Sequence, residues 1–154
     1  RAGAEVVIAS VNGAKLVKGR CEMTLQADST LANVAPESFD MLFIPGGPGV
    51  KMLREDGRAA TLAAEFARRH KTVAAICAAP TVLADAGLLA GKRFTAHFSV
   101  HAQLPGVVAD ERVVKDGNLI TSRGAGTAVE FGLELVRELF GEAKVREVAA
   151  SIML

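Results

Sequence analysis

The chain has 154 residues, half of them hydrophobic, and its 18 basic and 17 acidic residues nearly cancel. This length suits one domain with a real core, and the lack of a basic cluster argues against a nucleic-acid partner. Two cysteines are too few for a disulfide framework and fit a reducing, cytoplasmic compartment, while no apolar run approaches the ~20 residues of a membrane helix. We therefore expect a single domain over residues 1–154 that uses neither nucleic acid nor a membrane.

The first predicted element is a strand over residues 4–11, which ends at the turn signal Asn12-Gly13. Arg1-Ala2-Gly3 precedes it and is typical of the last turn of a helix with Gly3 as its C-cap. This favours a fold whose N-terminal strand and helix are missing from this chain. The alternative is a domain that begins with the strand at 4–11.

The other elements follow from hydrophobic periodicity and turn signals. In chain order we expect a short strand at 18–25, a helical turn at 29–34, a strand at 39–44, an amphipathic helix at 58–69, a strand at 72–76, a helix up to Ala86 capped by Gly87, a strand at 93–96, a hairpin at 113–121 with Asp116-Gly117 at its turn, and helices at 126–140 and 142–150 broken by Gly141. Strands that alternate with helices predict an α/β fold with an open, mostly parallel sheet.

Cys77 is the strongest candidate for chemistry in the chain. It follows the buried strand at 72–76 and precedes an alanine- and leucine-rich helix, so we expect it on a sharp strand-to-helix turn. Ala75, Ala78 and Ala79 supply the small neighbours that such a turn needs. The N–H groups and the dipole of the helix would stabilise a thiolate there. The alternative is a small core residue, because free cysteines are often buried.

Three loops rich in small residues are expected at the C-terminal edge of the sheet, where α/β proteins bind ligands. They are the segment 45–49, the turn at Cys77 and the segment 121–127. The amide of Gly46 or Gly47, with that of Ala78, would form an oxyanion hole beside the thiolate. The alternative for each glycine-rich loop is a plain tight turn. The loop at Gly46 lacks the spacing of a phosphate-binding fingerprint.

Among the three histidines, His97 is placed best to exchange protons with Cys77, because the strand at 93–96 ends at the same edge. The alternative for His97 is a structural role. His70 lies in a basic helix end and is expected to be a solvated cap, and His101 is less well placed. No cysteine and histidine spacing indicates a metal site. Cys21 is expected to be structural or a surface thiol.

Four segments together resemble the ThiJ/PfpI superfamily, and most closely its parkinsonism-associated deglycase branch. They are 44–47, 74–80, 95–97 and 116–127, and the resemblance extends over essentially the whole chain in the same motif order. Amidotransferases and protease-like relatives place a histidine directly after the nucleophilic cysteine. Ala78 stands there in this chain, so a Cys-His-Glu hydrolase is not expected.

The resemblance implies a flavodoxin-like three-layer sandwich and a homodimer, with Glu130-Phe131 and the helix after it on the dimer side. It implies that Cys77 is a reactive, oxidation-prone nucleophile with His97 nearby and the amides of Gly46, Gly47 and Ala78 around it. Arg123, Gly124 and Ala125 are the candidates for the substrate pocket, and no cofactor is expected.

The family also places a glutamate from the first strand–helix connection beside the cysteine. No residue of this chain matches it, since Glu5 lies on a different element. We therefore expect a separate N-terminal peptide or a partner chain to carry the missing strand and glutamate.

The function that the resemblance implies is that of a glutathione-independent glyoxalase or deglycase. Cys77 would add to the aldehyde of methylglyoxal or a related 2-oxoaldehyde, or act on its adducts, and the product would be a 2-hydroxy acid. The alternative is a redox-responsive protective protein or chaperone, in which Cys77 is oxidised to a sulfinate.

Overall fold

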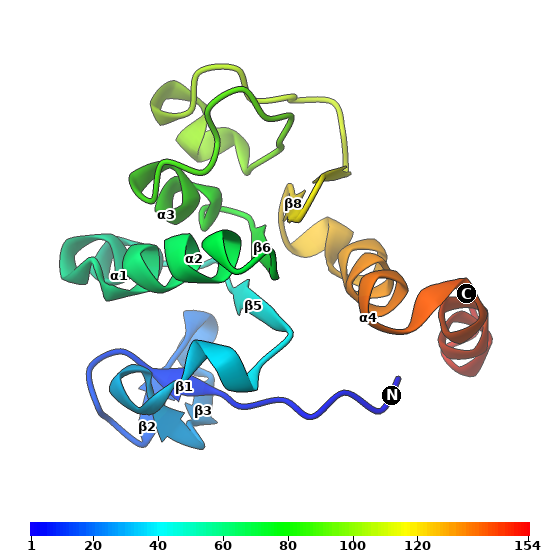
Figure 1. The fold of residues 1–154 in the computed structure, drawn as a ribbon, viewed down its shortest axis with the longest axis horizontal. Coiled ribbons are helices and arrows are strands. Elements are labelled where there is room, and N and C mark those ends of the chain that lie inside the picture. Colours follow the sequence, from blue (N-terminus) through cyan, green and yellow to red (C-terminus); the bar gives the residue numbers. More distant parts are fainter.

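A four-stranded sheet lies at the centre of the structure, a computed structural model that describes all of residues 1–154 (Figure 1). Its strands are β5 (Met41–Ile44), β6 (Thr72–Ile76), β8 (Leu119–Ser122) and β7 (Val113–Asp116), in this order across the sheet. The first three are parallel, and β7 is antiparallel to β8. The predicted mostly parallel sheet is therefore confirmed.

Helices cover both faces of this sheet, as expected for a three-layer sandwich. The first face carries α1 (Val50–Asp56), α2 (Arg58–Arg68) and α3 (Pro80–Asp85), and the second carries α4 (Ala128–Ser151) (Figure 1). The prediction of α2 is confirmed, whereas α1 was not predicted. Its seven residues include only three apolar side chains, too few for a helical period to stand out.

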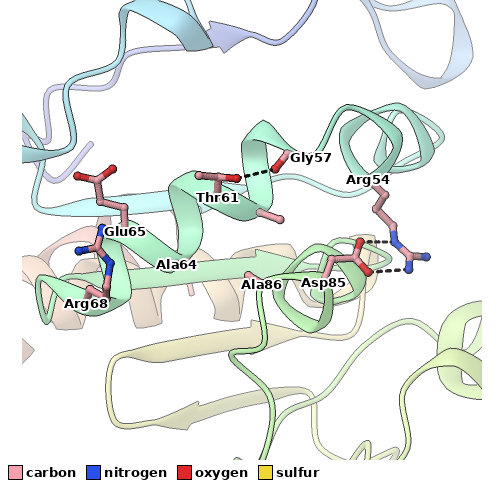
Figure 2. Close-up of a pocket in the computed structure, with 9 residues that line it drawn as sticks. Arg54, Gly57, Thr61, Ala64, Glu65, Arg68, Asp85 and Ala86 are labelled. Atoms are coloured by element: carbon pink, nitrogen blue, oxygen red, sulfur yellow. Dashed lines mark hydrogen bonds and ion pairs between the residues drawn. The ribbon is translucent and has the colours of Figure 1, made fainter.

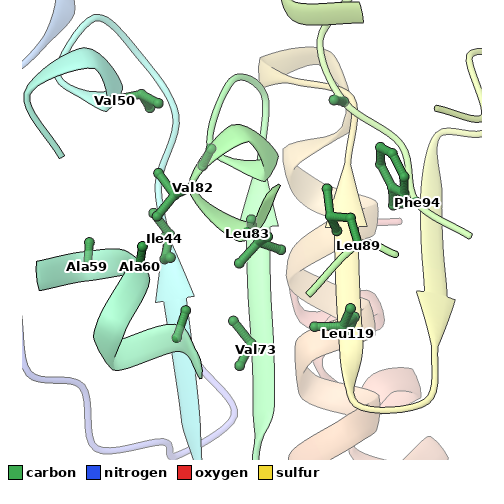
Figure 3. Close-up of a cluster of buried hydrophobic side chains, with 14 of the residues drawn as sticks. Ile44, Val50, Ala59, Ala60, Val73, Val82, Leu83, Leu89, Phe94 and Leu119 are labelled. Atoms are coloured by element: carbon green, nitrogen blue, oxygen red, sulfur yellow. The ribbon is translucent and has the colours of Figure 1, made fainter. Parts of the chain in front are cut away.

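The side chains of β6 alternate between two apolar clusters and so tie the layers together. Val73 and Ala75 belong to the larger cluster with α2 and α3, in which Ile44, Val82 and Leu83 are also buried (Figure 3). On the opposite face Ala74 and Ile76 pack with Ile120 and with Phe131 of α4. Because every residue of β6 is buried, the point where the chain leaves the sheet is firmly fixed.

The N-terminal part forms two small ladders apart from the central sheet. The strand β1 (Ala9–Ser10) pairs in parallel with β4 (Ser29–Thr30), and β2 (Leu16–Lys18) pairs antiparallel with β3 (Thr24–Gln26). The prediction of one strand at 18–25 is wrong, because a 3-10 turn at Arg20–Glu22 divides this region into a hairpin.

The predicted strand at 4–11 is wrong except for Ala9 and Ser10. Val6, Val7 and Ile8 have no ladder partner and are exposed to 73%, 44% and 43%. The Ile8 N–H instead donates to the carboxylate of Asp28 at 2.9 Å. The Ile8 carbonyl accepts from the N–H groups of Asp28 and Ser29, so pairing begins only there, and residues 4–7 have no strand beside them.

The helical turn expected at 29–34 is present only in part. Ser29 and Thr30 form β4, and the 3-10 turn spans Leu31–Asn33, with a further 3-10 turn at Pro36–Ser38.

The predicted strand at 93–96 is wrong as secondary structure, although Phe94, Thr95 and Ala96 are buried as expected. Their backbone bonds to side chains and to a loop: the Thr95 N–H donates to Thr121 Oγ1 at 2.9 Å, and Phe94 O accepts from the Val108 N–H at 2.8 Å. A buried extended segment therefore ends where the strand was expected to end.

Two predictions near the C-terminus are confirmed with adjusted details. The hairpin of β7 and β8 has Gly117 and Asn118 at the centre of its turn, with Gly117 at φ 62°, so the turn lies one residue later than predicted. The two predicted C-terminal helices form α4, interrupted at Gly141, whose φ is 79°. None of the helices combines the length and the hydropathy that a membrane crossing requires.

Candidate active site

Cys77 occupies the turn between β6 and α3 in the left-handed backbone region, with a φ of 66°. Its N–H donates to Ser122 O at 2.9 Å, and its carbonyl oxygen accepts from the His97 N–H at 2.8 Å. A non-glycine residue pays roughly 1–2 kcal/mol for such a conformation, which persists where surrounding bonds enforce it and which is frequent at active sites. The thiol is thus held out of the strand at the edge of the sheet, half-buried.

The loop after β5 packs directly on this turn, and only glycine fits at position 46. A β-carbon added to Gly46 would lie 2.5 Å from the Cys77 β-carbon, 2.8 Å from Ile76 O and 3.2 Å from the Cys77 Sγ. The first two separations are shorter than real β-carbon contacts allow, and the third is tighter than most. Gly46 therefore brings its backbone against the sulfur atom.

Three backbone N–H groups in the loop after β5 and in the Cys77 turn have no acceptor within the chain. They belong to Gly46, Gly47 and Ala78, whereas the next amide, that of Ala79, donates to Ile76 O at 3.1 Å. Since α3 has only six residues, these individual N–H groups, more than a helix dipole, are what the site offers to negative charge. Unpaired donors beside a thiol suit either a thiolate or an oxyanion formed next to it.

The loop at 121–127 places Gly124 against His97, which follows the buried segment 94–96. A β-carbon on Gly124 would lie 3.3 Å from Cδ2 of His97 and 4.0 Å from Cys77 Sγ, so the ring edge and the sulfur border one small space. Thr127 holds this loop, because its buried hydroxyl donates to Gly124 O at 2.9 Å and contacts Ser122 Oγ at 2.6 Å. Sequence reasoning did not single out Thr127.

The remaining predicted or considered residues flank this constellation or lie away from it. Arg123 and Ala125 are exposed beside Gly124, and the guanidinium of Arg123 makes no hydrogen bond or ion pair within the chain. His70 is exposed at the end of α2, and His101 Nε2 donates to Ala96 O at 3.1 Å. Cys21 is exposed in the 3-10 turn of the N-terminal hairpin.

A cleft of about 660 Å³ opens beside the turn and is bordered by Gly47 and Ala78. Its charged groups largely compensate one another: Arg54 donates to both carboxylate oxygens of Asp85, at 2.7 and 2.9 Å, and these bonds raise the pKa of Arg54. The cleft therefore reaches the residue that follows Cys77 and carries no strong net charge.

A second hollow, of about 510 Å³, lies between α2 and α3 (Figure 2). It shares the Arg54–Asp85 pair at one end and has Glu65 and Arg68 at the other (Figure 2). No cysteine or histidine lines it, and its carboxylates Glu65 and Asp85 are paired with Arg69 and Arg54. No group of three or more potential metal ligands is assembled anywhere in the structure.

Comparison with known proteins gives consistent matches. The model of the DJ-1/PfpI family matches residues 1–138. Protein dj-1beta of Drosophila melanogaster is 43% identical over 161 residues, which cover 100% of this chain and 84% of the relative. Its crystal structure aligns with a TM-score of 0.94, over 99% of this chain and 84% of that one.

Two further relatives have names that state a reaction. The glutathione-independent glyoxalase DJR-1.2 of Caenorhabditis elegans is 34% identical over 100% of this chain and 83% of the relative. An isonitrile hydratase of Pseudomonas putida is 39% identical over 67% of this chain and 46% of the relative. Enzymes of different reactions thus share this sequence pattern.

Proposed function

The chain belongs to the DJ-1/PfpI family, and we propose that it is a cysteine-dependent glyoxalase that needs no cofactor. Its substrates are 2-oxoaldehydes of the methylglyoxal type or their adducts, and its products are 2-hydroxy acids. The observation that supports this most is the strained Cys77, which faces unpaired amides on one side and His97 across Gly124 on the other. The glyoxalase activity named for DJR-1.2 agrees with it.

The proposed reaction begins when the Cys77 sulfur bonds to the aldehyde carbon and the carbonyl oxygen takes up a proton, which gives a hemithioacetal. The hydrogen on that carbon then leaves as a proton while the ketone oxygen gains one, which gives an enediol. The former ketone carbon next gains a proton, the hydroxyl on the sulfur-bound carbon loses its own, and a thioester of the 2-hydroxy acid results. Water hydrolyses the thioester and frees the thiol. The sum is addition of one water to the 2-oxoaldehyde, so no oxidant, reductant or glutathione is consumed.

Each part of the site has a role in these reaction steps. The unpaired amides of Gly46, Gly47 and Ala78 stabilise the negative oxygen that forms as sulfur adds, a kind of interaction whose loss costs roughly 10²–10³-fold in kcat. His97 passes protons to and from the substrate beside the sulfur. The cleft next to Ala78 admits a small polar molecule.

The carboxylate implied by the family is the remaining part of the proposal. No Asp or Glu side chain bonds to His97. We propose that a strand from outside these 154 residues pairs with the free edge of β5 and brings the carboxylate to Cys77. In support, β5 is paired only with β6, and Phe43 on it is exposed, as are Val6 and Val7.

The direct test is a time course with methylglyoxal in buffer free of glutathione. We expect loss of the aldehyde to be matched by formation of lactate, measured by chromatography. Loss of methylglyoxal without lactate would mean only scavenging by surface side chains and would contradict a glyoxalase.

A redox-responsive protective protein is the second candidate, favoured by the same half-buried thiol with free N–H donors. Two peroxide molecules would each transfer one oxygen atom to the sulfur and leave as water, and the amides would hold the resulting sulfinate. If this is the main role, stoichiometric peroxide should convert Cys77 to sulfinate ahead of Cys21, while methylglyoxal gives no lactate. Peptide mass spectrometry and the lactate assay separate the two roles.

Replacing His97 by alanine should lower kcat by roughly 10²–10⁴-fold, the usual contribution of a general acid or base. His70→Ala is the matched control, since His70 is exposed at the end of α2, and it should leave kcat unchanged. Steady-state kinetics of both variants give the comparison. Equal kcat values for the two variants would assign proton transfer to another group.

A further inference from the structure

His97 is anchored so that its two ring edges face different surroundings. Its backbone N–H donates to Cys77 O at 2.8 Å, and the face of its ring packs against Phe98 with the ring centroids 4.3 Å apart. The edge that carries Cδ2 is turned to Gly124, on the side of the Cys77 sulfur. Because Cδ2 is bonded to Nε2, the nitrogen nearer the reaction space is Nε2.

The opposite edge, with Nδ1, is occupied by Ser99. The Ser99 hydroxyl lies 2.8 Å from Nδ1, and the Ser99 backbone N–H donates to the same atom at 3.3 Å. His97 thus takes the N-cap position of the 3-10 helix Phe98–Gln103, where its ring accepts a bond that Ser, Thr, Asp or Asn usually accepts.

These contacts decide which nitrogen carries the proton. A backbone N–H can only donate, so this 3.3 Å bond favours the ring form in which Nδ1 presents its lone pair and the proton of the neutral ring sits on Nε2. A flipped ring would place carbon against both Ser99 donors and lose the two bonds. The Ser99 hydroxyl, which has no other partner in the chain, adds a second donor to Nδ1.

We propose that Ser99 is a positioning residue that holds His97 in the Nε2–H tautomer. This rests on the proposed function and sharpens it: resting His97 meets the aldehyde oxygen as a hydrogen-bond donor when Cys77 adds, and does not act as the base that removes the thiol proton. Ser99 itself touches neither the substrate nor the sulfur.

The tautomer is measured directly by ¹⁵N–¹H NMR of protein with labelled histidine, without substrate, with the His97 signals assigned from His97→Ala. We expect a proton on Nε2 and none on Nδ1 in the unsubstituted protein and in Ser99→Thr, which keeps the hydroxyl. Ser99→Ala should populate the Nδ1–H form, because only the longer backbone bond then remains. A proton on Nδ1 in the unsubstituted protein, or no change in Ser99→Ala, would overturn the proposal.

Kinetics supply the second readout. Ser99→Ala should lower kcat by about three- to tenfold, the range of one hydrogen bond, with KM nearly unchanged, and Ser99→Thr should restore most of it. The control is Ser38→Ala, another exposed serine in a 3-10 turn, which should change neither kcat nor the spectrum. An Nε2–H ring in a protein without lactate formation would refute the proposed function and leave the tautomer assignment standing.

Discussion

Replacement of Cys77 by serine should abolish lactate formation from methylglyoxal while the protein stays folded. Serine has nearly the same shape, so the backbone bonds to Ser122 and His97 can remain. Its hydroxyl is a far weaker nucleophile near pH 7 than a thiolate. We expect kcat/KM to fall by at least about 10³-fold, as for other enzymes that lose their nucleophile.

The matched control for that variant is Cys21→Ser, which removes the exposed thiol of the N-terminal hairpin. It should keep full turnover. Circular dichroism and the urea midpoint of unfolding show whether both variants are folded. If kcat/KM of Cys77→Ser stays within a few fold of that of the unsubstituted protein, the covalent mechanism is contradicted.

Replacement of Gly46 by alanine should damage the site through a single added methyl group. The new β-carbon would overlap the Cys77 β-carbon and Ile76 O, at 2.5 and 2.8 Å, so the loop or the turn must move. Overpacking of this kind costs about 1–3 kcal/mol of folding free energy. We expect a lower urea midpoint, and also slower alkylation of Cys77 by iodoacetamide, because the displaced loop no longer brings its amides to the sulfur.

Gly49→Ala is the control, because Gly49 has an ordinary helical backbone with a φ of −64° and an added β-carbon there meets nothing within 4 Å. It should change the free energy of unfolding by no more than about 0.5 kcal/mol, and it should leave the rate of Cys77 alkylation unchanged. If Gly46→Ala behaves like Gly49→Ala, the packing of the loop on the turn is not what prepares the sulfur.

The centre of the fold was predictable because its signals are local. The buried run at 72–76, the small residues after it and the glycines at 46 and 124 are visible in the sequence, and the topology of a parallel sheet brings their ends to one edge. The family resemblance extended this to the three-layer architecture, which the structure confirms.

The predictions that were wrong concern segments whose structure depends on neighbours in space, which no local sequence pattern reveals. Residues 4–7 have the pattern of a strand but lack a partner. Residues 94–96 are buried without being a strand, and the N–H groups of Arg93 and Thr95 bond to the side chains of Asp116 and Thr121. The support of the Gly124 loop by Thr127 and the bond from Ser99 to His97 are contacts of single hydroxyl groups. Serine and threonine are common in loops for many reasons, so composition alone does not point to them.

The measurement that tests the central claim most directly is peptide mass spectrometry of protein mixed with methylglyoxal and quenched in acid during turnover. The hemithioacetal and the 2-hydroxyacyl thioester are isomers, so both add the mass of one methylglyoxal to the peptide that contains Cys77. We predict this adduct on Cys77, none on Cys21, and its decay at the rate at which lactate appears. Lactate formation at full rate with Cys77 unmodified throughout would contradict the account.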